Sequence, residues 1–128
     1  MLSVDTYIAA FYLSPAAICV TALDGRVIEV NESFCQLSGY SRQELIGRSA
    51  MELNLFADPW DRTKILALLK KDGSLKQCRN RVIRKDAEFR DTLGPVQIVH
   101  VDAQVGLLMM LLDVTPAERA ENGTSQTG

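Results

Sequence analysis

Apolar and polar positions recur along the chain with two different periods, and the first segment has the period of a helix. Residues 4–13 place several apolar side chains on one helical face: Ile8, Phe11 and Tyr12. Ser3 can cap the first turn, and Pro15 prevents the helix from continuing. We therefore expect an N-terminal amphipathic helix over residues 4–13.

A pair of strands is expected next, followed by a short helix. Segments 17–21 and 26–30 are rich in β-branched residues, and the turn pair Asp24-Gly25 between them predicts an antiparallel hairpin. Asn31 is a good N-cap for a following helix, and Gly39 stands where a left-handed C-terminal residue is favoured.

Two more helices are predicted in the middle of the chain. Ser41 and Glu44 have the spacing of a capping box for a one-turn helix. Asp58 followed by proline predicts the start of a longer helix over residues 59–71. Its inward residues are expected to be Ile65, Leu66, Leu68 and Leu69.

The last third of the chain has the composition of strands. Segment 77–85 predicts a polar strand, 96–101 a strand after the breaker pair Gly94-Pro95, and 106–114 an apolar strand. Thr115 then has the features of a helix cap. This order predicts an α+β fold with a five-stranded antiparallel sheet and short helices on one face.

Composition and charge narrow the functional classes. The 128 residues carry a net charge of −2, which is unlike a protein that depends on phosphate contacts, so we expect no nucleic-acid partner. No apolar run approaches the twenty residues of a membrane span, and no signal peptide is recognisable. The three cysteines are odd in number and widely spaced, which favours a reducing cytoplasm and no metal site.

An ordered series of short motifs extends over about residues 5 to 118. It includes Ser14-Pro15-Ala16, Leu23-Asp24-Gly25, Asn31-Glu32-Ser33-Phe34, Leu37-Ser38-Gly39-Tyr40, Asp58-Pro59-Trp60 and Leu112-Asp113-Val114-Thr115. In this order the motifs resemble a PAS domain, the sensory module of bacterial signalling proteins. Two features depart from the pattern. Ala87 replaces a usual glycine, and segment 88–95 is longer than a tight hairpin requires.

The resemblance implies a cytoplasmic, non-enzymatic sensor or regulatory module. We expect a flanking helix over residues 1–13, a PAS core over 14–115, and a short helix start with a disordered polar tail over 116–128. Family members similar to this chain often dimerise through the N-terminal helix, here with Ile8, Phe11 and Tyr12. Asp113 and Thr115 would relay the signal to an effector domain, a histidine kinase or similar, in cis or in trans. Because no kinase, cyclase or DNA-binding segment is visible, we expect a fragment of a longer protein or a partner acting in trans.

The residues expected to line a ligand pocket are Asn31, Phe34, Tyr40, Trp60, Leu66, His100 and Met109. Five of them also have a simpler structural explanation. Helix capping alone would explain Asn31, and packing would explain Tyr40 and Trp60. His100 would then be a strand residue that faces solvent, and Met109 would fill space in the core.

The cofactor is unknown from sequence. Flavin photochemistry of the light-oxygen-voltage branch needs a cysteine where this chain has Gly47-Arg48-Ser49-Ala50-Met51-Glu52, so a covalent flavin adduct is not expected. Haem is not expected either, because similar haem proteins take the axial histidine from the helical layer, and His100 lies on the predicted fourth strand.

Two other classes of function stay open. A ligand-free dimerisation or interaction domain would have a filled core, which the bulky apolar residues Ile18, Leu66, Met109 and Leu111 favour. A small α+β enzyme would need an inward carboxylate paired with His100.

Overall fold

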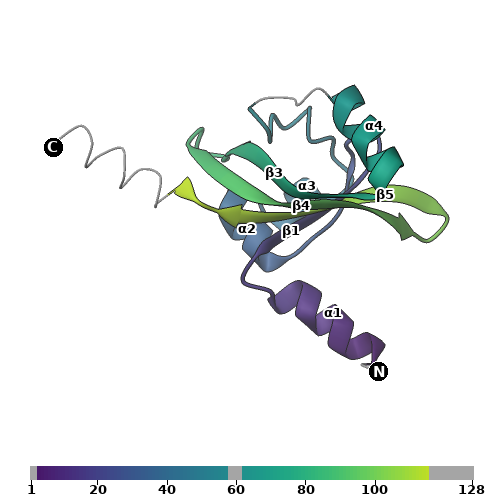
Figure 1. Ribbon diagram of the computed structural model, residues 1–128. Coiled ribbons are helices and arrows are strands. Elements are labelled where there is room, and N and C mark those ends of the chain that lie inside the picture. The colour runs from purple at the N-terminus through teal and green to yellow at the C-terminus, as the bar shows by residue number, and fades with distance from the viewer. Residues whose placement is uncertain (1–2, 58–61, 116–128) are drawn as a thin grey trace, which may run out of the picture.

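Figure 1 shows a computed structural model of the protein, which describes residues 3–57 and 62–115. The chain forms four helices and five strands in these ranges. In order they are α1 (Val4–Leu13), β1 (Ala17–Ala22), β2 (Val27–Val30), α2 (Glu32–Ser38), α3 (Arg42–Leu45), α4 (Arg62–Asp72), β3 (Ser74–Ile83), β4 (Phe89–Val101) and β5 (Gln104–Asp113).

The strands form one antiparallel sheet in the order β2-β1-β5-β4-β3, which confirms the predicted fold class. β1 pairs with β5 from Ala17 opposite Leu111 to Ala22 opposite Gly106. Because the two strands run in opposite directions, the start of β1 and the end of β5 lie at the same end of the sheet. The chain therefore enters and leaves the sheet side by side.

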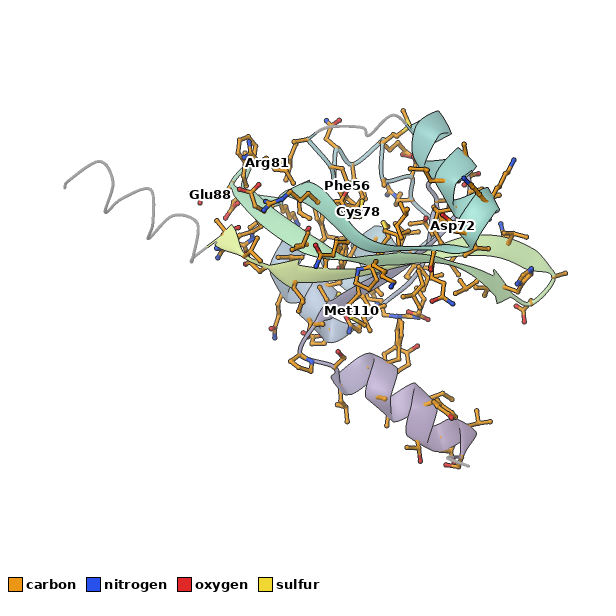
Figure 2. The ribbon with its side chains drawn as sticks, viewed as in Figure 1. Phe56, Asp72, Cys78, Arg81, Glu88 and Met110 are labelled. Atoms are coloured by element: carbon orange, nitrogen blue, oxygen red, sulfur yellow. The ribbon has the colours of Figure 1, made fainter. Side chains whose placement is uncertain are left out.

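The core lies between the sheet and the helices α2, α3 and α4. Its strand residues include Cys19, Val96 and Met109, which pack in one apolar cluster with residues from the covering segments: Phe34, Leu45, Leu55 and Leu69. Figure 2 shows Cys78 pointing toward this covered face and Met110 pointing to the opposite face. The helix α1 projects from that opposite side of the sheet (Figure 1).

The segment between α3 and the end of the described range at Ala57 bonds to both edge strands. At the β2 edge, the amide of Val27 donates to the carbonyl of Arg48, and the amide of Gly47 donates to the carbonyl of Val27, both at 2.8 Å. At the β3 edge, the amide of Ala57 donates to Arg81 at 2.9 Å, and the amide of Ile83 donates to Leu55 at 2.8 Å.

The local helix signals are confirmed. α1 has the predicted bounds, and the Ser3 hydroxyl accepts a hydrogen bond from the amide of Thr6. Ser41 and Glu44 form both hydrogen bonds of the capping box. Gly39 ends α2 with φ of 79°, a left-handed conformation in which a side chain would be strained.

The prediction that Gly94-Pro95 precedes a strand is wrong, because β4 runs from Phe89 through both residues. On the neighbouring strand two residues stand opposite Pro95, since Leu75 pairs with Val96 and Cys78 pairs with Gly94. This β-bulge accommodates a residue that has no amide hydrogen to donate. A Cβ atom on Gly94 would lie 1.9 Å from the carbonyl oxygen of Met110, so the close approach of β5 requires glycine there.

Other boundaries also shift. Ala87 adopts a positive φ of 72° in the turn before β4, so segment 88–95 is mostly strand rather than a long connection. β3 begins at Ser74 instead of 77, and β5 covers Gln104–Asp113 instead of 106–114. In α4, Leu69 is fully buried, but Leu68 is 41% exposed, which contradicts its predicted inward position. The predicted start of this helix at Asp58 and the side chain of Ile65 lie outside the described residues.

Candidate functional site

Asn31 joins three elements at the point where the chain enters the sheet. Its side chain is 1% exposed, and its carboxamide oxygen accepts hydrogen bonds from the amides of Ile18 at 2.9 Å and Phe34 at 3.0 Å. Its amide nitrogen donates to the carbonyls of Phe11 at 3.0 Å and Ala16 at 2.9 Å. These four bonds use both donors and both acceptor positions of the carboxamide. We call Asn31 and the segment Ser14–Ala17 the entrance junction.

A second contact holds the end of α1 near the sheet. Arg42 donates to both carboxylate oxygens of Glu29, at 2.9 and 2.8 Å. Partial burial opposes the ionisation of Glu29, but hydrogen bonds from Arg42, from the amide of Val30 and from Tyr12 outweigh it and lower its pKa. Partial burial and the hydrogen bond to Glu29 raise the pKa of Tyr12. The Glu29 carboxylate on β2 is therefore paired with Arg42 and interacts electrostatically with Tyr12.

The rest of α1 has an exposed apolar surface. None of its residues is buried, and Val4 and Leu13 are 72% and 80% exposed. Of the residues expected at a dimer interface, Ile8 and Tyr12 are exposed, and Phe11 is half-buried with its ring edge-on to Tyr12. The structure therefore places the three predicted dimer residues on one largely uncovered helix.

Thr115 is fixed to β4 where the chain leaves the sheet. Its side chain is buried, and its hydroxyl accepts a hydrogen bond from the amide of Asp91 at 2.5 Å and donates to the carbonyl of Asp91 at 3.3 Å. The amide of Thr115 donates to the carboxylate of Asp113 at 2.9 Å. Arg81 forms an ion pair with Asp91 at 2.7 Å. Arg90 forms a second ion pair with Asp113 at 3.5 Å. We call Asp91 with Asp113–Thr115 the exit junction; the short helix start expected after Thr115 lies outside the described residues.

The predicted pocket residues are only partly brought together. Phe34 and Met109 are buried in the apolar cluster, and Leu66 packs against it. Tyr40 is half-buried, with the ammonium of Lys85 5.9 Å from its ring centre. His100 is exposed near the end of β4, and Trp60 lies outside the described residues.

Sequence reasoning missed a buried polar group on the covered face of the sheet. Asn80 donates to the sulfur of Cys78 at 3.9 Å, and the hydroxyl of Thr92 donates to the carbonyl of Asn80 at 3.1 Å. All three residues are buried, and burial raises the pKa of the Cys78 thiol. The alternation of Cys78, Asn80 and Val82 along a strand could have revealed that they share one face.

A groove was also missed, because its residues come from distant segments. It has a volume of about 260 Å³ and lies between α2, the start of β1 and the end of β5. It is lined by Pro15, Ala16, Ala17, Ser33, Gln36, Leu37, Arg84, Arg90, Leu111, Leu112 and Asp113. The groove thus contacts both the entrance and the exit junction.

Metal and thiol chemistry find little support in the described part of the chain. No group of three histidine, cysteine or acidic side chains in residues 3–57 and 62–115 could hold a metal ion. Cys19, Cys35 and Cys78 are free thiols, and burial raises the pKa of Cys19 to about 12, which suppresses its thiolate. No helix within the described ranges is long and apolar enough to cross a membrane.

Comparison with known proteins identifies the family. The model of the PAS fold matches residues 6–114, and the chain therefore belongs to the PAS family. PAS domains are generally sensory modules without catalysis of their own. No curated protein matches the chain.

Solved structures share the fold at low sequence identity. A PAS domain from Colwellia psychrerythraea is 24% identical with a TM-score of 0.72, covering 88% of this chain and 97% of its own. An RNA-binding light-oxygen-voltage receptor is 22% identical with a TM-score of 0.73, covering 96% of this chain and 36% of its own. A domain of a sensory box sensor histidine kinase/response regulator from Geobacter sulfurreducens is 16% identical with a TM-score of 0.63. The match covers 83% of this chain and 90% of that domain.

Proposed function

We propose that this PAS domain is a non-enzymatic regulatory module of signal transduction that works as a homodimer. Residues 1–13 flank a sensory core of residues 14–115, and a change in that core reaches an effector domain through Asp113 and Thr115. The observation that carries the proposal is the apolar helix α1, which is exposed along its length and joined to the core at the entrance junction.

The exposed helix supports self-association. An isolated helix of ten residues is marginal in water, and most helices gain their stability from packing an apolar face. The side of the sheet from which α1 projects is also apolar, with Leu108 and Met110 half-buried and Leu112 exposed on β5. A second copy would offer the same two apolar surfaces, so a symmetric dimer would cover both.

The two junctions support a relay between dimer and effector. Asn31 bonds the end of α1 to the first strand of the sheet, and Thr115 bonds the last strand to β4. β1 and β5 are paired neighbours, so a shift of α1 would reach the exit by a short path. A histidine kinase or a similar domain, in cis or in trans, is the proposed effector, by analogy with the domain from Geobacter sulfurreducens. The three free cysteines are consistent with action in the cytoplasm.

A second candidate is a ligand-free interaction domain with the same dimer. It is favoured by the apolar cluster, in which Phe34, Leu45 and Leu55 are fully buried against the sheet. Under the first candidate a small molecule occupies the core and changes the dimer; under the second, association with a partner is itself the signal.

Native mass spectrometry of freshly purified protein, beside a denatured control, tests both candidates. A dimer with excess mass that disappears on denaturation supports the ligand-responsive module. A dimer without excess mass supports the ligand-free domain. A monomer at micromolar concentration would overturn the proposed homodimer.

A matched pair of variants locates the interface. Ile8→Asp places a charge on the exposed face of α1 and should convert the dimer to a monomer. Val105→Asp places the same charge on another exposed apolar residue, near the start of β5, and should leave the dimer intact. Equal effects of the two substitutions would contradict an interface at α1.

A further inference from the structure

We infer that the groove between α2 and the end of β5 binds a small carboxylate with an apolar tail. The groove opens beside the exit junction at the margin of the apolar cluster of the core, to which Ala17 and Leu111 belong, and Figure 1 shows α2 next to the end of β5 that forms one of its walls. Binding there does not depend on the proposed dimer or on a ligand in the core.

The shape and lining of the groove suit a small amphipathic molecule. Its volume of about 260 Å³ is just below the roughly 300 Å³ at which typical ligand pockets begin, so the ligand is small. Pro15, Leu37 and Leu112 provide the accessible apolar part of the lining for a short hydrocarbon tail, and the lining residues Ala17 and Leu111 are buried. Arg84 and Arg90 provide positive charge for the head group, against a single carboxylate in the lining, that of Asp113.

The two arginines have different roles in this site. Arg84 is held in place, because it donates to the carbonyls of Leu37 at 3.0 Å and Gln36 at 3.3 Å and lies 3.5 Å from Asp86. Arg90 is held less firmly. In the described part of the chain, it forms an ion pair in which its Nε lies 3.5 Å from a carboxylate oxygen of Asp113. Its terminal nitrogens can therefore take a carboxylate in the paired geometry that arginine favours.

Binding at Arg90 would reach the exit junction directly. The carboxylate of Asp113 approaches Arg90 with one oxygen and accepts from the amide of Thr115 with the other. A ligand carboxylate would compete with Asp113 for Arg90 and so change the charge beside Thr115. This consequence rests on the proposed relay, whereas the binding itself does not.

Amide-resolved NMR of the ¹⁵N-labelled 128-residue chain tests the site with hexanoate as the probe. We expect saturable shifts of the amides of Ala17, Leu37 and Leu111. Hexanol has the same tail without the charge and should give no saturable shifts at these positions. Acetate has the charge without the tail and should bind at least about tenfold more weakly, since each buried CH₂ is worth about 0.8 kcal/mol. Shifts that do not saturate with hexanoate, or equal binding of hexanol or acetate, would overturn the inference.

Arg90→Gln and Arg48→Gln are the matched variants. Arg90→Gln should weaken hexanoate binding about tenfold or more, the usual loss for a charge-assisted hydrogen bond. Arg48→Gln removes an equal charge from an exposed residue outside the groove and should change binding less than twofold. A well-dispersed spectrum of Arg90→Gln shows that the variant is folded, and unchanged affinity in it would contradict the site. Saturable binding without any shift at Asp91 or Thr115 would leave the site standing and overturn its link to the relay.

Discussion

The entrance and exit junctions lie at the same end of the sheet but are held together by different kinds of interaction. At the entrance, one neutral and fully buried carboxamide makes four hydrogen bonds to backbone groups. At the exit, a buried hydroxyl is surrounded by charged side chains that keep contact with solvent, with Asp91 and Asp113 27% and 30% exposed.

This difference determines which junction can respond to its surroundings. A buried neutral group is insensitive to salt and has no proton to gain or lose near neutral pH. Ion pairs at the surface are weak and are screened by salt, so their balance can change with pH, ionic strength or a bound anion. The entrance is therefore built to be fixed, and the exit is built to be adjustable.

The largest expected effect follows removal of the carboxamide at the entrance. Asn31→Ala loses a helix cap and leaves buried amides and carbonyls without a partner, which we expect to cost about 3 kcal/mol of unfolding free energy. Urea denaturation measures the loss. Asn31→Asp retains the two acceptor bonds but buries a carboxylate whose second oxygen faces the carbonyls of Phe11 and Ala16, so at neutral pH it should be at least as unstable as Asn31→Ala.

Gln43→Ala is the control for this substitution, because it removes an exposed carboxamide from α3. It should change stability by less than about 0.5 kcal/mol. A loss below about 1 kcal/mol in Asn31→Ala would show that the four hydrogen bonds do not fix the entrance.

The exit should be less sensitive to removal of its hydroxyl. Thr115→Val keeps the shape of the side chain but leaves the amide of Asp91 without its side-chain acceptor, which should cost about 1–2 kcal/mol. Thr115→Ser restores the hydroxyl and should recover most of the loss in the same urea experiment. If Thr115→Ser is as unstable as Thr115→Val, the methyl group rather than the hydroxyl holds the exit.

A pH titration examines a charged contact on the entrance side. The pKa of Glu29 is lowered in the folded protein, so its contribution to stability is fully present above its unfolded pKa of about 4.3 and is lost as the pH falls through the folded value. Because the partner Arg42 is exposed, we expect a contribution below about 1 kcal/mol.

The difference in unfolding free energy between wild type and Glu29→Gln measures this contribution. It should be constant from pH 7 to pH 5 and shrink below about pH 4.3. A difference that grows on acidification would mean that the ionised carboxylate is not the stabilising form.

The smallest expected effect is a response to salt. Raising the salt concentration from about 0.05 to about 0.5 M should screen the pair of Arg81 and Asp91 and speed hydrogen exchange at the amides of Asp91 and Val114 by about two- to threefold. The amides of Ile18 and Phe34, both bonded to Asn31, should be unaffected. An equal response at both junctions would remove the distinction between them.

The sequence predicted best those features that depend on neighbouring residues. The N-caps Ser3, Asn31 and Ser41 can be predicted because each accepts a hydrogen bond from an amide within one turn. Gly39 can be predicted for the same reason, because its amide donates to a carbonyl in the last turn of α2. The other half of Asn31's role could not be predicted, because its donors reach Phe11 and Ala16, 20 and 15 residues away.

Errors arose where a distant strand changed the local rule. Gly94-Pro95 normally interrupts a strand, but the bulge in β3 accommodates the proline, and the glycine allows β5 to approach. The groove was likewise invisible, because Arg84 and Arg90 are brought beside Pro15 and Leu37 only when the sheet and α2 assemble.

The bonds that the residues between α3 and Ala57 make to both edges of the sheet affect how this molecule can associate. An open sheet has two rows of unsatisfied backbone groups, and such rows invite another chain to add a strand, the route to fibrils and swapped dimers. Here Gly47 and Arg48 occupy part of one row, and Leu55 and Ala57 occupy part of the other. Strand addition is blocked at these positions, so any association of two copies there would have to use side-chain surfaces rather than backbone pairing.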